Sequence, residues 1–413
     1  MKNVLVKSTF SDLAYLLNTT ISFIAYSRIN PHCHSPKAII KRFFYGYEFK
    51  NIEPYFDQEI FISSVTQRPN YLNLIKNTTS HKKDSAIYFP EASQKKNYAL
   101  KNILYAIYWF WKQCISNHKT WSLKELLFIA SEISITLNTI DFLEKNYKDK
   151  IKCKKFLCFD ATFGHDALLV SLFKRFKIPT YSLQHSFFFK FKSFIPEEII
   201  KYDVNYPDYY LFWSQKQIDV VVKNFGALPH NLLIAGNPNY RNKEIPIVKQ
   251  TFRKCLVLLS RFYYHKENLL LLKELSKMEN IEFDIRPHPS LKEIPEQIDF
   301  NEYINTCNLY GFTLDENKKV LGKVFRDGNY DFSICFNTAA YFDSLSSGLI
   351  CFRYAFNENE DFEGLDDKFI TQRQLIEKIE DFKKQSPEAL REKISTILNE
   401  AIGTDTFEYP NIL

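Results

Sequence analysis

The sequence is poor in glycine and has no paired cysteine motif. Only 10 of its 413 residues are glycine, so each glycine marks a backbone turn worth locating. The eight cysteines include no Cys-x-x-Cys pair and lie mostly inside apolar runs, which predicts reduced, buried thiols and a cytoplasmic protein. The sequence also has no dense Lys/Arg block and no nucleic-acid recognition motif, so we expect no nucleic-acid partner.

Long apolar runs are missing as well. The N-terminal stretch MKNVLVKSTF has neither the apolar core nor the cleavage site of a secretory leader, so we expect none. The most apolar stretch, Ile103–Trp111, is far shorter than the roughly 20 residues that span a bilayer, and Lys101 and Lys112 flank it. Any membrane contact is therefore expected to be peripheral, at the inner face of the cytoplasmic membrane.

What is present fits a globular chain of two domains. Hydrophobic residues make up 45% and charged residues 25%, a balance that excludes general disorder, and 413 residues exceed one ordinary core. The net charge of +6 favours anionic partners such as nucleotide phosphates, acidic glycans or an anionic membrane. A mildly basic protein without such partners has the same charge.

Apolar runs that alternate with helical patterns predict an α/β fold built on parallel sheets. We predict strands at 4–6, 23–26, 156–159, 180–183, 209–213, 232–235, 255–259, 281–285, 332–336 and 349–352. We predict helices at 97–115, 122–146, 166–176, 214–225, 266–278, 338–347 and 386–403. Residues 45–95 allow no assignment. The expected domains are 1–205 and 206–385, with a hinge between about 190 and 250 and a C-terminal helix in 386–413 that crosses back.

Four polar residues follow the central strands and are candidates for catalysis. Asp160 ends one strand, His165 and Asp166 open the next helix, and His185 ends the following strand. Ligands of parallel α/β sheets bind in loops at the carboxyl ends of strands. Transfer to a hydroxyl needs a base, and aspartate or histidine can serve as one. His185 or Asp160 is therefore the expected base.

The segment Arg286-Pro287-His288-Pro289 is the sharpest signal in the second half. Its prolines stiffen a strand end from which Arg286 and His288 can bind phosphate oxygens. A stiff turn with a solvent-facing histidine is the alternative.

Other strand ends extend the expected donor site. Asn337 is expected to cap a helix whose first backbone N–H groups, with Thr338, receive an anion, and Asp343 could reach a ribose. The remaining candidates for donor binding are Ser260, Arg261, Gly236 and Asn237. The segment His32-Cys33-His34 has too few ligands for a metal site, and we expect none.

These motifs resemble a series found in GT-B glycosyltransferases that build bacterial surface polysaccharides. The series comprises Leu183-Gln184-His185, Gly236-Asn237-Pro238, Arg286-Pro287-His288-Pro289 and Asn337-Thr338. The motifs are also similar to those of CDP-glycerol glycerophosphotransferases and of sialyltransferases with a His-Pro motif. The sequence departs from the former where Ser186, and not glycine, follows His185, and from the latter because an Asp/Glu-Asp/Glu-Gly motif is missing.

The resemblance implies two Rossmann-like domains that face each other across a cleft, with the acceptor held by the first and the nucleotide donor by the second. The expected activity is metal-independent transfer of a sugar, CMP- or UDP-linked, to a hydroxyl of a capsule, lipooligosaccharide or O-antigen glycan. The acceptor would be a glycan or a lipid-linked glycan, and no cofactor is expected. The alternatives are a CDP-glycerol-type glycerophosphotransferase, a CMP-sialic acid or Kdo transferase, a nucleotide-sugar epimerase and a binding module without catalysis.

Overall fold

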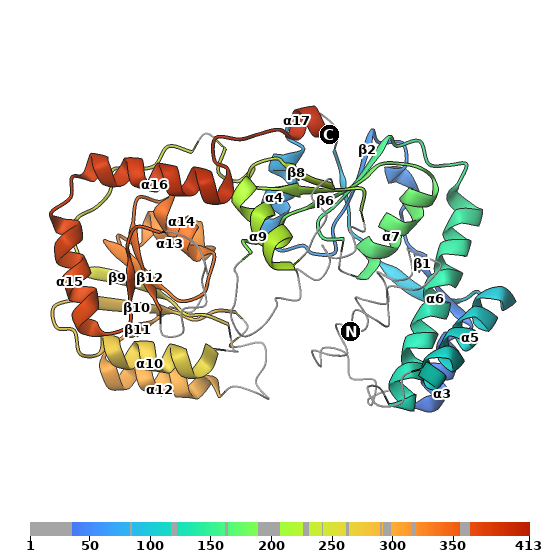
Figure 1. Ribbon diagram of the computed structural model, residues 1–413, viewed down its shortest axis with the longest axis horizontal. Coiled ribbons are helices and arrows are strands. Elements are labelled where there is room, and N and C mark those ends of the chain that lie inside the picture. The colour runs from blue at the N-terminus through green and yellow to red at the C-terminus, as the bar shows by residue number, and fades with distance from the viewer. Residues whose placement is uncertain are drawn as a thin grey trace.

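A computed structural model describes residues 35–82, 85–116, 122–161, 164–188, 207–225, 231–241, 243–261, 264–289, 291, 299–315, 319–355 and 364–413. Two α/β domains lie side by side, and each is built on a six-stranded sheet (Figure 1). All strand pairs inside these two sheets are parallel. The predicted α/β architecture with two Rossmann-like domains is confirmed.

The first sheet has the strand order β3-β2-β5-β6-β7-β8. Its strands are β2 (Ile60–Ser63), β3 (Ile87–Tyr88), β5 (Lys155–Cys158), β6 (Thr180–Leu183), β7 (Tyr209–Phe212) and β8 (Leu232–Ile234). All four residues of β2 and of β6 are buried, as expected for short apolar strands covered on both faces. Helices α4 (Pro69–Thr78), α7 (Gly164–Arg175) and α9 (Gln215–Phe225) belong to this domain.

A helical projection extends from this sheet (Figure 1). It contains α3 (Pro36–Arg42), α5 (Leu100–Ser116), α6 (Leu123–Tyr147) and a two-stranded antiparallel sheet of β1 (Tyr45–Phe49) and β4 (Ala92–Lys96). Ser122 and Glu125 form a capping box at the start of α6. Among the described residues, α6 is the one helix long and apolar enough to cross a membrane, but 78% of its most apolar window is buried within the protein. It is therefore placed as a core helix.

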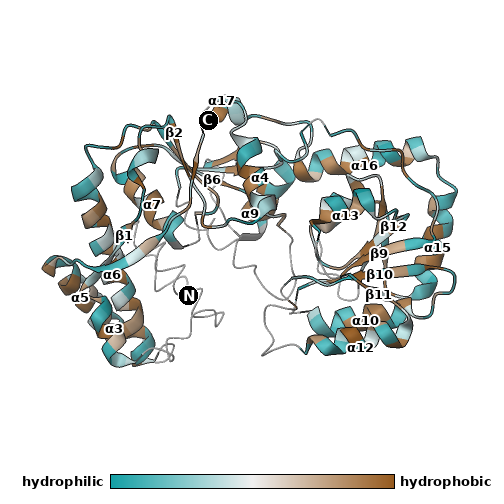
Figure 2. Ribbon diagram, turned by 180° about the vertical axis from the view of Figure 1, so that it is seen from behind, coloured by the Kyte–Doolittle hydropathy of each residue, from teal (hydrophilic) through white to brown (hydrophobic). Residues whose placement is uncertain are grey.

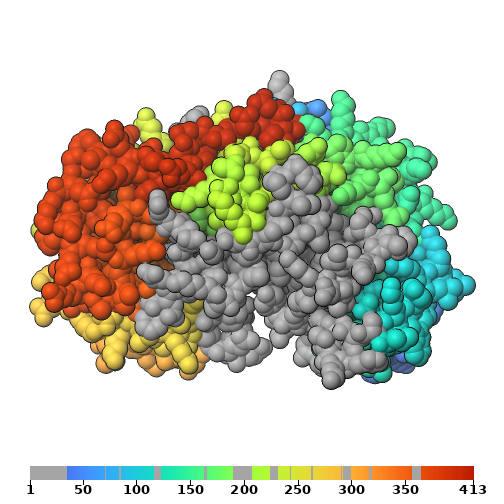
Figure 3. All heavy atoms as spheres, in the orientation of Figure 1, coloured from blue at the N-terminus to red at the C-terminus, as the bar shows by residue number. Residues whose placement is uncertain are grey.

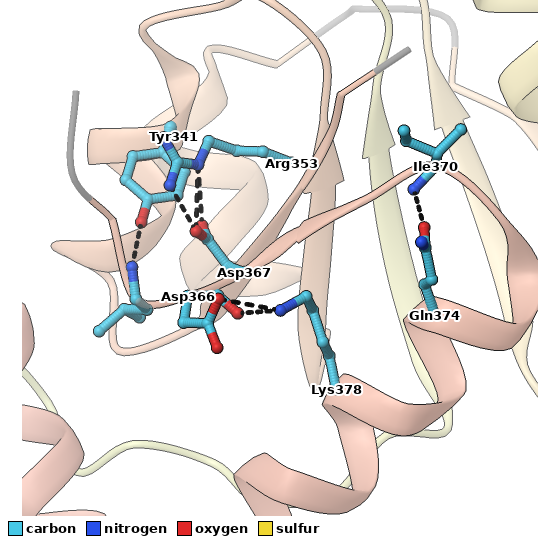
Figure 4. A network of polar contacts seen from close by, with 8 residues as sticks. Tyr341, Arg353, Asp366, Asp367, Ile370, Gln374 and Lys378 are labelled. Carbon is cyan, nitrogen blue, oxygen red and sulfur yellow. Dashed lines mark hydrogen bonds and ion pairs between the residues drawn. The ribbon is translucent and has the colours of Figure 1, made fainter. Parts of the chain in front are cut away.

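The second sheet has the order β11-β10-β9-β12-β13-β14. Its strands are β9 (Lys254–Leu258), β10 (Glu282–Arg286), β11 (Thr313–Leu314), β12 (Phe332–Cys335), β13 (Ile350–Tyr354) and β14 (Lys368–Phe369). Its helices are α10 (His265–Leu275), α12 (Phe300–Tyr310), α13 (Leu321–Asp327), α14 (Ala340–Leu345) and α15 (Gln372–Lys383). The edge pair β13 and β14 is fastened by a buried ion pair, because Arg353 Nη2 lies 2.6 Å from Asp367 Oδ1 and the guanidinium also stacks over Tyr341 (Figure 4).

The C-terminal segment returns from the second domain to the first. Helix α16 (Pro387–Ile402) ends at Gly403 and is followed by α17 (Tyr409–Ile412). Lys155 at the start of β5 donates hydrogen bonds of 2.9 Å to the carbonyls of Ile412 and Leu413. The space-filling view shows this red segment running along the yellow-green residues around α9 (Figure 3). The described parts of the chain therefore cross between the domains twice.

Two predictions need correction, and three others lie outside the described residues. β7 and β8 pair with the first sheet, so the division expected at 205/206 separates strands of one sheet, and the first sheet extends to Ile234. The helix predicted at 338–347 covers only Ala340–Leu345. The strands predicted at 4–6 and 23–26 and the segment His32-Cys33-His34 lie outside the described residues.

Candidate functional site

Two polar side chains meet at the carboxyl ends of the neighbouring strands β5 and β6. Asp160 and His185 each lie two residues beyond the end of their strand, and β5 and β6 pair in parallel. The His185 Nδ1 atom lies 3.4 Å from Asp160 Oδ2, and both side chains are buried. A carboxylate at one ring nitrogen fixes the imidazole and leaves Nε2 to accept a proton. The structure thus brings together two residues predicted from the sequence, His185 and the acid that orients it, Asp160.

Asp166 lies close to this pair. Ser63, the last residue of β2, donates a 2.5 Å hydrogen bond to Asp166 Oδ1. Burial, together with the smaller effect of the negative charge of Asp160, raises the pKa of Asp166 to about 7, while the hydrogen bond from Ser63 lowers it. Asp166 is therefore protonated in part of the molecules near neutral pH. Ser63 was missed because residues 45–95 showed no readable pattern, although Ile60–Ser63 ends a short apolar run.

Aromatic rings fix the orientation of His185 but hold His165 elsewhere. The His185 ring lies 5.2 Å from Phe159 and 6.2 Å, edge-on, from Tyr71, measured between ring centroids. The His165 ring packs instead against Tyr47 and Phe49 of β1, at 5.3 and 5.4 Å. Burial lowers the pKa of His165. Of the four first-domain candidates, Asp160, Asp166 and His185 gather, and His165 packs on β1.

Positively charged side chains from both domains lie around His288, and together they form a cationic cluster. Burial, together with the positive charges of Arg261 and Arg68, lowers the pKa of His288 to about 4. Arg261 follows β9 of the second sheet, whereas Arg68 is the residue before α4 in the first domain. Two guanidinium groups from different domains therefore act on one neutral imidazole. Arg68 was not predicted as a site residue, because only the fold brings it near His288.

Arg286 is already engaged by its own domain. Its guanidinium donates a 2.5 Å hydrogen bond to Asp315 and a 2.6 Å bond to the carbonyl of Lys319. These contacts hold the guanidinium against the loop that follows β11. The structure thus gives Arg286 a loop-holding role beside any contact with phosphate, which stays a prediction.

Asn337 has an unusual backbone and a free amide. Its φ is +45°, a left-handed conformation uncommon outside glycine, and among the described residues its buried Nδ2 atom has no hydrogen-bond partner. Ser260 Oγ donates to the Asn337 carbonyl at 3.4 Å, which links the loops after β9 and β12. The predicted capping role of Asn337 is wrong, because Ala339 occupies the N-cap of α14. Thr338 Oγ1 accepts a 3.3 Å bond from the Ala340 N–H.

The remaining candidates lie where the chain crosses between domains. The Asn237 N–H donates to the Ile402 carbonyl at 3.1 Å, and the Tyr409 hydroxyl donates to the Gly236 carbonyl at 2.8 Å. Asp343 accepts a hydrogen bond from Tyr240 in the linker. These contacts give the three residues packing roles, and the donor contacts predicted for them stay predictions.

The described residues contain no group of three His, Cys, Asp or Glu side chains arranged to hold a metal. A pocket lined by Lys174, Lys177, Asp208 and neighbouring residues opens near the amino ends of β6 and β7, away from Asp160 and His185. Chemically, the candidate site therefore combines a carboxylate-oriented imidazole with a cationic cluster at the junction of two domains.

No protein-family model and no curated protein matches the chain. Among solved structures, it is similar to a UDP-N-acetylglucosamine 2-epimerase from Rickettsia bellii, with 13% identity and a TM-score of 0.46, covering 82% of this chain and 95% of that one. It is also similar to the lipopolysaccharide outer core galactosyltransferase WaaB, with 11% identity and a TM-score of 0.44, covering 86% and 97%. The wall teichoic acid polymerase TagF gives 12% identity and a TM-score of 0.37, covering 66% and 82%. Likeness at this level carries no argument about activity.

Proposed function

We propose that the protein is a cytoplasmic glycosyltransferase that moves a sugar from a nucleotide-activated donor to a hydroxyl group of a bacterial surface glycan. The single observation that carries the proposal is the convergence of Arg68, Arg261 and His288 at the junction of the two domains. Cationic groups from both domains around one site suit a ligand with two or more phosphate charges. The nucleoside diphosphate of a sugar donor has this charge.

The chemistry follows from the charges. As the bond between sugar and phosphate breaks, negative charge grows on the leaving phosphate, and Arg68 and Arg261 stabilise it. His288, whose pKa of about 4 keeps it neutral at pH 7, donates one N–H to a phosphate oxygen. Asn337 Nδ2 supplies a further neutral donor. Arg68 and Arg261 provide positive charge of the kind that a metal ion supplies in other transferases, and we propose that no metal ion is needed.

The acceptor side belongs to the first domain. His185, held by Asp160 at 3.4 Å, takes the proton of the acceptor hydroxyl at Nε2 as the new glycosidic bond forms. The proton transfer makes an imidazolium ion, which the Asp160 carboxylate stabilises. This division of labour agrees with the roles that the sequence motifs imply.

Ligand-induced stabilisation tests the donor site. The melting temperature is measured with CMP, CDP, UDP, GDP and their sugar conjugates, since a ligand that binds only the native state raises it. We expect one nucleotide to raise it in the wild type and to lose most of this effect in Arg68→Gln and His288→Ala. Arg373→Gln, which changes an 88% exposed arginine of α15, is the matched control and should respond like the wild type. No shift with any nucleotide at millimolar concentration would contradict the proposal.

Product analysis separates the transferase from its alternatives. The bound donor is incubated with and without candidate glycan acceptors, and both sugar and nucleotide are followed. Release of nucleotide together with a new glycosidic bond supports the proposal. Conversion of the donor sugar without acceptor would identify an epimerase instead, and turnover of CDP-glycerol alone would identify a glycerophosphotransferase.

A further inference from the structure

Helix α5 has its apolar residues on the outside. Its solvent-facing side chains are 40% to 70% exposed and comprise Leu100, Leu104, Ile107, Tyr108, Trp111 and Ile115. These residues recur at intervals of three and four, so they form one stripe along the helix. Figure 2 shows apolar residues along α5 at the edge of the molecule. A surface helix of a globular protein normally turns such a stripe toward the core.

The inward face of α5 is already filled. Ile103, Ala106 and Trp109 pack in a core cluster with residues of α3 and α6. Asn102 donates hydrogen bonds of 3.0 Å to Asn138, which is buried, and to Asp141, which is partly buried, both on α6. These buried contacts fix which side of α5 faces the protein, so the helix cannot turn its outer stripe inward. An apolar stripe of this extent marks a surface that binds another surface.

Positive charge surrounds the stripe. α3 and α5 together carry Lys37, Lys41, Arg42, Lys101 and Lys112 and no aspartate or glutamate. Glu132 and Asp141 of α6 pair with Arg42 and Lys101, which leaves the projection with a net positive charge. Lys101 and Lys112 lie on the same exposed side of α5 as the stripe, and Lys101 remains 72% exposed beside Asp141.

We propose that this α5 stripe docks on an anionic lipid bilayer. Trp and Tyr favour the boundary between headgroups and acyl chains, Leu and Ile enter the acyl region, and lysines attract anionic headgroups. A second copy of the chain fits less well, because a symmetric contact would set the same lysines against each other. With 17 residues, and with its inner face packed against α3 and α6, α5 lies on the membrane and does not cross it.

The consequence concerns the acceptor. The first domain carries both the α5 projection and the Asp160–His185 pair. Docking through α5 would hold the first domain at the bilayer, where a lipid-linked glycan lies. This last step rests on the proposed function, whereas the docking surface does not.

Vesicle flotation with the full chain tests the surface without any assay of activity. The bound fraction is measured with vesicles of phosphatidylcholine alone and with about one third phosphatidylglycerol. We expect binding to the anionic vesicles, a decrease of about tenfold or more in the double variant Leu104→Ser/Trp111→Ser, and weaker binding in Lys101→Gln/Lys112→Gln. The nucleotide-induced rise in melting temperature should stay unchanged in both double variants, which also shows that they fold.

Two control variants match these changes on other surfaces. Leu309→Ser alters a 76% exposed leucine of α12, and Lys223→Gln alters a 72% exposed lysine of α9. Both should bind anionic vesicles like the wild type. The proposal is overturned if the wild type ignores both kinds of vesicle, if Leu309→Ser loses as much binding as the double leucine and tryptophan variant, or if the chain forms a dimer that Leu104→Ser/Trp111→Ser dissolves.

Discussion

The two domains present opposite chemistry at the candidate site. The first contributes Asp160, Asp166 and His185, which can hold and move a proton, whereas the second contributes Arg261 and His288, which suit an anion. Burial acts on both sides, yet it raises the pKa of Asp166 and lowers the pKa of His288. One cause thus favours the neutral form of both groups, because burial penalises charge of either sign. Arg68 breaks this division, since it comes from the first domain and acts on the second.

Replacing His185 should separate the two sides most clearly. In His185→Ala, we expect the rate of transfer to fall by about 10²- to 10⁴-fold because the general base is lost. Nucleotide affinity should stay within about twofold of the wild type, since the base lies on the acceptor side. Single-turnover kinetics and calorimetric titration measure the two quantities. Equal losses in both would show that the domains do not divide the work.

Asp166 should make stability depend on pH in one direction. Its pKa rises from 3.8 in the unfolded chain to about 7 in the folded protein, so the folded state holds a proton that the unfolded state has released between these values. Stability therefore falls as the pH rises from about 4 to about 7. In Asp166→Asn this loss disappears. The free energy of unfolding of the variant relative to that of the wild type should therefore be larger at pH 8 than at pH 4, by on the order of a few kcal/mol. Urea unfolding at both pH values measures it, and a difference independent of pH would contradict the expectation.

His288 should give the opposite slope. Its pKa falls from 6.5 to about 4 on folding, so the unfolded chain binds the extra proton between these values and stability is lost as the pH falls through this window. His288→Gln should remove that loss, which reaches up to about 3 kcal/mol of the free energy of unfolding at pH 4. The same unfolding series measures it. Parallel slopes for this variant and Asp166→Asn would show that burial does not set the contrast between the two sides.

Replacing Arg68 should give the smallest of these effects, and it tests whether the first domain takes part in phosphate binding. Arg68→Gln and Arg261→Gln should each weaken nucleotide binding by about 10- to 100-fold, because each removes one charge-assisted hydrogen bond. Similar losses from residues of different domains would place the phosphates between them. A normal affinity in Arg68→Gln, measured by calorimetry, would assign phosphate binding to the second domain alone.

The sequence predicted most of the sheets because their strands are short, fully apolar runs. β5, β6, β9, β10, β12 and β13 all lie within a residue or two of the expected ranges. β1 and β4 escaped prediction because β4 consists mostly of exposed polar residues, and β2 lay between segments without a clear period. The domain division failed at β7 and β8 for another reason. A strand pattern does not state which sheet the strand joins.

The residues of the candidate site that were predicted from the sequence also follow apolar strands, and those that were missed do not follow a predicted element. Asp160 and His185 were found because strand ends in a parallel sheet predict where loops meet. Ser63 and Arg68 were missed because they reach the site from a segment with no assigned element. Gly236 and Asn237 were predicted to bind the donor, and their hydrogen bonds to the returning segment were not expected, because a loop rich in Gly, Asn and Pro after a strand has the same composition in either role.

The double crossing between the domains restricts how they can move. Gly236 and Gly403 touch where the outgoing and returning chains meet, both with positive φ, and a side chain on Gly236 would overlap the Thr406 carbonyl oxygen. A single linker allows rotation in any direction. Two connecting segments in contact resist twisting and sliding of the domains. The motion that they resist least is bending about an axis through the two glycines. Opening and closing of the site would then be a one-dimensional movement, with Arg68 and His288 approaching and separating along a fixed arc.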